Sequence, residues 1–328
     1  MKKFITICAL AAMTVSAMAA PKTYGLFSPD GKITVSVETG EKLTYTLYHG
    51  EDLIIDKSEI QMVLADGTVY GGAQKKNPKV SIKGVDQKHV PVLYKKSEIV
   101  DRYNEMTLKY KDYSVVFRAY DEGVAYRFIS HATAPFKVKD ELAEFNFAQE
   151  WNCWVPYVNS RRKTDVGRFW SSFENTYNYL PVSKWDSKEL VFLPFMVDGP
   201  NGKKIVITEA DLMNYPGMLL CNTDGDARIE NIYAPVPKTV KQGGHNELQM
   251  VVQEYEDYIA KFDSGCSFPW RIITISENDA QMMDNDEETP ELDSLQASQL
   301  AWDWMKPCYW QTLTYNCTTN ITDDHEQN

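Results

Sequence analysis

The stretch VVFRAYDEGVAYRF, residues 115–128, decides the fold of this 328-residue chain. Apolar residues occupy every second position in 115–117 and in 124–128, on either side of the turn Asp121-Glu122-Gly123. A period of two is typical of a β-strand with one buried face, and a short turn containing glycine joins two such strands. The stretch therefore predicts an antiparallel β-hairpin.

The same pattern continues in both directions along the chain. Glycine-containing turns separate short runs of alternating or continuous apolar residues, and we find no convincing amphipathic helix between Pro21 and Glu277. Regularly spaced strands of this kind predict an all-β, antiparallel sandwich of two large sheets over residues 20–276. The further runs lie at 33–37, 43–47, 53–55, 248–252 and 272–275.

The first residues have the form of an export signal. Lys2 and Lys3 precede the apolar stretch 4–15, and Ser16-Ala17-Met18-Ala19 supplies the small residues of a cleavage site. The apolar stretch is too short to span a bilayer. We therefore expect residues 1–19 to be a signal peptide, and the mature protein to be periplasmic or secreted with no membrane anchor.

The charge balance narrows the choice of partners. The chain has 46 acidic and 34 basic residues, a net charge of −12, and loss of Lys2 and Lys3 makes it −14. An acidic surface repels nucleic acid and anionic lipid, so neither is an expected partner. Neutral sugars and Ca²⁺ suit such a surface.

Cysteine and histidine argue against a disulfide scaffold and a zinc site. Cleavage leaves five scattered cysteines, and the five histidines show no HExxH spacing. Cys221 and Cys266 are the first pair to test for a disulfide, although two buried free thiols are at least as consistent with the sequence.

The composition changes near the end of the expected sandwich. Residues 277–293 hold eight acidic residues and no basic one, which favours a solvated linker. Within it, Asp284-Asn285-Asp286-Glu287-Glu288 lacks the glycine and the spaced final glutamate of an EF-hand. Residues 294–328 follow as a separate segment with an atypical tail.

The segment from Trp151 to Trp185 is the best candidate site. It contains four of the eight tryptophans, several other aromatic residues and both basic and acidic side chains, and much of it lacks a strand period. A long aromatic-rich loop suits sugar binding, because rings stack on pyranose faces and charged groups bond the hydroxyls. Trp170, Tyr177 and Arg168 are the candidate saccharide contacts. We take Trp151 and Trp154 as core residues.

Sequence motifs for catalysis are absent. The chain contains no GxSxG, no glycine-rich phosphate loop and no nucleophile pair of Cys and His. Glycoside hydrolysis needs two opposed carboxylates, and 46 acidic residues do not single out a pair. Glu209 ends an apolar strand, a position that is consistent with a site carboxylate, but we favour the interpretation that it caps a turn or pairs with an arginine. The residues alone lead to an exported β domain with a sugar-binding surface.

The ordered set of segments resembles glycoside hydrolase family 97 from Pro21 to about Pro307. The set includes Ser28-Pro29-Asp30-Gly31-Lys32, Tyr103-Asn104-Glu105, residues 117–128, Trp154-Val155-Pro156, Thr208-Glu209-Ala210 and Pro269-Trp270-Arg271. The resemblance implies a β-super-sandwich similar to galactose mutarotase, packed in the family on a catalytic (β/α)8 barrel. It also implies an exported α-glucosidase or α-galactosidase that acts on α-glycosides or oligosaccharides.

The resemblance gives Glu174 a specific role. Ser172-Phe173-Glu174-Asn175-Thr176-Tyr177 matches the family loop whose glutamate helps to hold a catalytic Ca²⁺. The other ligands and all catalytic residues belong to the barrel, so no catalytic residue is assigned in this chain. Asp303-Trp304-Met305-Lys306-Pro307 is similar to the approach to the first barrel strand, and the residues after it depart from the family.

Two interpretations follow. The first is an N-terminal domain that completes the active site of a calcium-dependent α-glycosidase and is inactive by itself. The alternative is a free-standing carbohydrate-binding module or a non-catalytic β scaffold. The sequence leaves open the sugar, the linkage, the stereochemical outcome and the oligomeric state.

Overall fold

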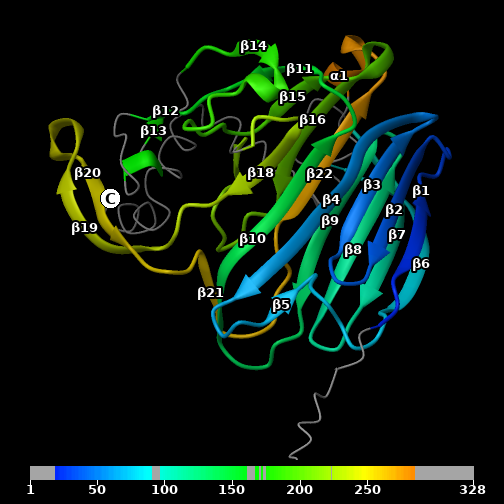
Figure 1. Cartoon of the computed structure of the whole chain (residues 1–328), viewed down its shortest axis with the longest axis horizontal. Coiled ribbons are helices and arrows are strands. Elements are labelled where there is room, and N and C mark those ends of the chain that lie inside the picture. The colour runs from blue at the N-terminus through cyan, green and yellow to red at the C-terminus, as the bar shows by residue number, and fades with distance from the viewer. Residues whose placement is uncertain are drawn as a thin grey trace, which may run out of the picture.

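A computed structural model describes residues 19–90, 97–160, 167–169, 171–172, 175–222 and 224–284. The described chain forms two large sheets packed face to face, with most loops gathered at one side (Figure 1). Every strand pairing in this part of the chain is antiparallel. The all-β sandwich predicted from the sequence is confirmed. Residues 1–18 of the expected signal peptide, residues 285–293 of the acidic linker and the segment 294–328 lie outside the described residues.

The hairpin from which the prediction began is present. Strands β8 (Tyr113–Tyr120) and β9 (Gly123–Ser130) pair around Asp121 and Glu122. All of β8 is buried on both faces, whereas the alternation predicted one buried face. The outer face is buried because Arg118 stacks there on two rings, 4.2 Å from the centroid of Tyr103 and 4.7 Å from that of Trp270.

The first sheet contains the N-terminal strands. Its short strand β5 (Val69–Tyr70) pairs with β4 (Asp52–Leu64), and its short strand β21 (Ala260–Phe262) pairs with β10 (Phe136–Phe147). In spatial order, the other strands are β1 (Lys22–Phe27), β2 (Ile33–Thr39), β3 (Thr44–His49), β4 (Asp52–Leu64), β10 (Phe136–Phe147), β18 (Arg228–Ile232) and β17 (Leu219–Cys221).

The second sheet contains the hairpin and carries the candidate segment at one edge. In spatial order, its strands are β14 (Asn178–Pro181), β11 (Asn152–Val155), β15 (Phe195–Asp198), β16 (Lys204–Ala210), β22 (Trp270–Ser276), β9, β8, β7 (Ile99–Lys109) and β6 (Lys79–His89).

The main core lies between the two sheets and follows the predicted period. In β2, the residues Ile33, Val35 and Val37 are fully buried and alternate with partly exposed residues. Phe117 and Tyr126 meet these residues from the second sheet, and Tyr45 contacts both rings. The alternation therefore identified the core face of the N-terminal strands.

A two-stranded ribbon stands apart from both sheets. It consists of β19 (Pro237–Gly243) and β20 (Gln249–Tyr255), which extend to the side in Figure 1. The run at 248–252 does form a strand. Its apolar period does not mark a buried face, because Val251 is the buried residue and Leu248 is 78% exposed. Among the described strands, β19 and β20 pair only with each other.

One charged cluster joins the sheets inside the core. Arg271 on β22 donates two hydrogen bonds to Glu141 on β10, at 2.8 and 2.9 Å, and one to Glu209 on β16 at 2.7 Å. The hydroxyl of Tyr215 donates to Glu141 at 2.7 Å, and the Met218 amide donates to Glu209. Glu209 therefore pairs with an arginine and a backbone amide, as interpreted from the sequence.

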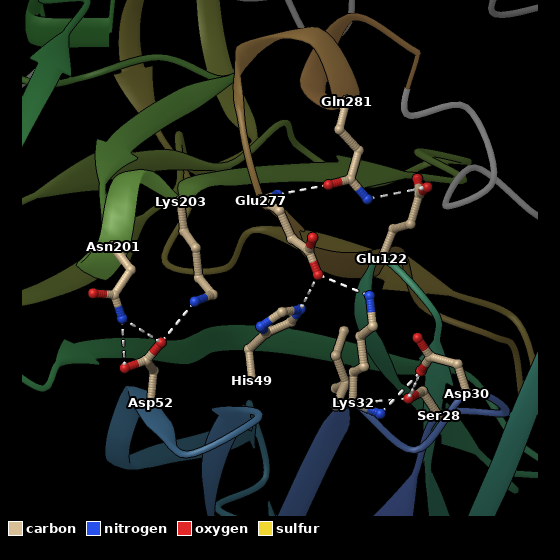
Figure 2. Close-up of polar contacts among 11 residues, drawn as sticks. Ser28, Asp30, Lys32, His49, Asp52, Glu122, Asn201, Lys203, Glu277 and Gln281 are labelled. Atoms are coloured by element: carbon tan, nitrogen blue, oxygen red, sulfur yellow. Dashed lines mark hydrogen bonds and ion pairs between the residues drawn. The ribbon is translucent and has the colours of Figure 1, made fainter.

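The residues that follow the last strand of the sandwich are bonded to the sandwich. We name residues 277–284 the exit segment. Helix α1 (Asp279–Asp284) follows β22 within the range expected to be a linker. Figure 2 shows Glu277 accepting a hydrogen bond from Lys32 at 2.8 Å, and Gln281 bonded to the Glu277 amide at 2.6 Å. The Lys32–Glu277 contact joins the exit segment to the turn before β2, and the Glu277–Gln281 contact lies within the exit segment.

The three described cysteines are free thiols. Cys221 lies on β17 and Cys266 precedes β22, so the pair considered first for a disulfide is not formed. Burial raises the pKa of each thiol to about 11, which keeps both protonated at neutral pH. Within the described residues, no helix has the length and hydropathy needed to cross a bilayer.

We predict a pH-dependent contribution to stability from Glu209. Burial raises its pKa from 4.5 to about 7, against the opposing effects of Arg271 and the Met218 amide. The folded state holds this proton more tightly than the unfolded chain, so the contribution is full below pH 4.5 and is lost as the pH rises through 7. The loss amounts to about 3 kcal/mol.

Denaturant melts of the wild type and of Glu209→Gln between pH 4.5 and 8 measure this effect. As the pH rises from 4.5 to 8, the unfolding free energy of the wild type should fall by about 3 kcal/mol relative to that of Glu209→Gln. A difference that stays constant over the range would contradict the assignment.

Candidate functional site

The candidate segment forms the loop-bearing edge of the second sheet. Strands β11 and β14 pair with each other, and the chain between them leaves the sheet. The excursion contains the short ladder of β12 (Asn159–Ser160) and β13 (Ser171–Ser172) and the 3-10 turn η1 (Gly167–Phe169). Figure 1 places this ladder on the same side of the molecule as the β19–β20 ribbon.

A small second core, separate from the main core, holds these loops. Phe169 is buried in it and meets the ring of Tyr255 on β20 edge to face, 6.0 Å between centroids. This core brings together residues from η1, β17 and the chain before β15. Its buried members are Val158, Phe169, Leu190, Phe192, Leu219, Cys221 and Ala234.

The backbone on both sides of Glu174 is held in place. Glu174 itself lies outside the described residues. On one side, Ser172 pairs with Asn159 in the β12–β13 ladder. On the other side, the side-chain amide of Asn175 donates to the carbonyl of Tyr157 at 3.1 Å and its oxygen accepts from the Thr176 amide. The described residues that flank Glu174 are therefore anchored on both sides.

Two of the three predicted saccharide contacts are described. Arg168 is partly buried in η1, with its guanidinium 5.5 Å from the ring centroid of Phe169. Tyr177 is 49% exposed and rests edge to face on Phe192, 6.2 Å between centroids. Both contact residues of the small second core, so they share one support. Trp170 lies outside the described residues.

One tryptophan of the segment that we predicted to be a core residue is exposed. Trp185 is buried and donates its indole N–H to the sulfur of Cys153. Trp151 packs at the margin of the main core, as expected. Trp154 is 38% exposed, so its assignment to the core was wrong. In β11 the residues Cys153 and Val155 point inward, which turns Trp154 outward, and the period of two contained this signal.

Glu209 and Glu141 do not form an accessible catalytic pair. Glu209 has a raised pKa, which is often a sign of an acid or base, but its side chain is only 8% exposed. Its oxygens bind Arg271 and the Met218 amide, and Glu141 binds the same arginine. These hydrogen bonds hold the two sheets together, and they leave Glu209 and Glu141 no free oxygen that could act on a substrate.

The described residues also offer no complete metal site. They contain no group of three or more histidine, cysteine, aspartate or glutamate side chains arranged around a common point. Ca²⁺ takes roughly 6–8 oxygen ligands, more than a single loop glutamate provides. A calcium ion at this edge would therefore need ligands from elsewhere.

Comparison with known proteins identifies the family. The family model described as glycosyl-hydrolase 97 N-terminal matches residues 26–287, which includes nearly all of the sandwich and the exit segment. The chain belongs to glycoside hydrolase family 97. The chain is 39% identical over 316 residues to a retaining α-galactosidase of Bacteroides thetaiotaomicron. The match covers 93% of this chain and 47% of that enzyme, so the chain spans about half the length of this curated relative.

Solved structures have the same fold. A family 97 enzyme of Pseudoalteromonas sp. strain K8 in complex with panose matches 80% of this chain and 37% of its own, with a TM-score of 0.62 and 22% identity. A β-arabinopyranosidase matches 78% of this chain and 40% of its own, with a TM-score of 0.61 and 20% identity. These likenesses place the sandwich of this family 97 chain among glycosidase structures.

We predict that Phe169 stabilises the loop-bearing edge and that Tyr177 does not. Phe169→Ala should lower the unfolding free energy by about 3 kcal/mol, because it empties a buried aromatic position. Tyr177→Ala should cost less than about 1 kcal/mol, because half of that side chain faces solvent. Guanidinium melts of both variants test the difference. Equal losses in the two variants would contradict the proposed support of the loops.

Proposed function

We propose that this family 97 chain is the domain that completes the active site of an α-glycosidase. Its match to the N-terminal family model and its similarity to a retaining α-galactosidase support the reaction class. The observation that carries the proposal is the pair of anchors around Glu174, the β12–β13 ladder and the Asn175–Tyr157 hydrogen bond. A loop held on both sides suits a residue that must reach into a neighbouring site.

Glu174 would be one calcium ligand in that site. A carboxylate oxygen is the hard ligand that Ca²⁺ prefers, and one carboxylate would supply one or two of the roughly 6–8 oxygens that the ion takes. When bound, the ion would polarise the sugar and orient reacting groups. The contribution of this chain would be to hold Glu174 in position through its neighbours.

The remaining candidates would contact the saccharide. Tyr177 exposes about half of its side chain, and an exposed ring can stack on the C–H face of a pyranose. Arg168 carries donors for hydroxyl oxygens, and Trp170 adds a second ring two residues along the chain. We also propose export of the mature chain to the periplasm or the medium, from the signal at residues 1–19.

A second candidate function is a carbohydrate-binding module that acts without a catalytic partner. The exposure of Tyr177 favours it, because about half of this aromatic side chain is in contact with solvent. Measurable affinity of the isolated chain for α-galactosides or maltooligosaccharides, lost in Tyr177→Ala, would support this function.

We predict that Glu174→Gln leaves the stability of the chain nearly unchanged but impairs catalysis in a complete enzyme. In the 328-residue chain the variant should change the unfolding free energy by less than about 0.5 kcal/mol. In a hybrid enzyme, residues 20–287 replace the part of the Bacteroides α-galactosidase that they match. There, the same change should lower kcat/KM for p-nitrophenyl α-galactoside at least about tenfold and weaken its calcium dependence.

The isolated chain is the control. It should hydrolyse neither the α-galactoside nor the α-glucoside, because hydrolysis needs two accessible carboxylates across the sugar. A large stability loss with unchanged hybrid kinetics would assign Glu174 to bracing its own loop and would refute the metal role.

A further inference from the structure

An exposed aromatic pair lies on the outer face of the loop-bearing edge. Trp154 on β11 and Tyr179 on β14 are direct cross-strand partners, with ring centroids 4.7 Å apart. Trp154 is 38% exposed and Tyr179 is 49% exposed. Met196 on β15 is opposite Trp154, and Val206 on β16 is opposite Met196, both partly exposed. We name these four side chains the aromatic face.

The polar groups around this face are already bound to one another. The Tyr179 hydroxyl donates to Asp198 at 2.6 Å and accepts from the Asn152 amide at 3.3 Å. The other oxygen of Asp198 accepts from Lys204 at 2.9 Å. These contacts hold the rings in one arrangement and leave few free hydrogen-bonding groups for sugar hydroxyls. A rigid, mostly apolar face of this kind suits a protein surface better than a saccharide.

The aromatic face lies between helix α1 and the residues that follow Glu174 in the sequence. On one side, Lys204 of β16 pairs with Asp279 of α1 at 3.6 Å, so the exit segment begins beside the face. From β16, the hydrogen-bonded order runs through β15 and β11 to β14. On the other side, Asn178 of β14 lies four residues after Glu174 in the sequence. Figure 1 shows β11 and β14 between α1 and the β12–β13 ladder.

We propose that the aromatic face is the docking surface for the other half of the enzyme. The curated relative is about twice as long as its match to this chain, so the family enzyme contains a second large part. The strands that carry this face lie on the direct path of a partner that begins after α1 and reaches the residues beside Glu174. The inference rests on the proposed function, because it assumes a catalytic partner that uses Glu174.

The expected partner surface follows from the chemistry of the face. Aliphatic or aromatic side chains would cover Trp154 and Tyr179, where rings make large contacts at low entropic cost. Asp279, with its side chain 82% exposed at the margin, would favour a basic residue on the partner.

Hydroxyl-radical footprinting of Trp154 and Tyr179 tests the proposal in the 328-residue chain and in the hybrid enzyme. Both side chains should react at least about fivefold more slowly in the hybrid, because an interface core excludes solvent. Phe27, 56% exposed on β1, is the matched control and should react equally in both proteins. Adding panose to the 328-residue chain should not slow the reaction of Trp154.

Equal rates for Trp154 and Tyr179 in the two proteins, whether or not the hybrid is active, would overturn the proposal. Protection by panose in the 328-residue chain without protection in the hybrid would overturn it in favour of a saccharide surface. The activity of the Glu174→Gln hybrid is read separately. Protected rings with an unaffected Glu174→Gln hybrid would support the docking surface and refute the role of Glu174.

Discussion

The contact between Arg271 and Glu141 is the interaction on which the sandwich depends most. It crosses from the second sheet to the first inside an apolar core, and Arg271 is 1% exposed. Breaking a buried charge pair by removing one partner costs about 3–5 kcal/mol, because the other charge remains buried. Glu209 adds a second carboxylate to the same arginine, so a single proton neutralises the cluster. The cluster fixes how the two sheets face each other.

This fixed relation between the sheets gives the functional edge its position. The described chain around the β12–β13 ladder is supported by a small core that includes Phe169 and Phe192, and this core rests on β17 and β18 of the first sheet and on Tyr255 of the β20 ribbon strand. At the other side of the same edge, Glu277 and Gln281 hold the exit segment. The structure therefore holds the residues on both sides of the proposed ligand Glu174, and it holds the start of the segment that follows the sandwich.

Much of the fold could be predicted because the period of two is a local signal. It identified the hairpin at 115–128 and the core face of β2, and the sequence also favoured a structural role for Glu209. It failed where burial depends on distant partners. Among the described strands, those of the ribbon around Leu248 pair only with each other, and the outer face of β8 is buried under a stacked Arg118. The candidate site was predictable as a segment only, because contacts such as Asn175 with Tyr157 arise from the folded loop.

The central claim is that this chain supplies one ligand to a calcium ion shared with a catalytic partner. Anomalous diffraction from crystals of the calcium-loaded hybrid enzyme tests it most directly. The account predicts a calcium peak about 2.3–2.6 Å from a carboxylate oxygen of Glu174, with the remaining ligands from the partner or from water. A calcium ion whose protein ligands all come from the partner, with Glu174 directed elsewhere, would contradict it.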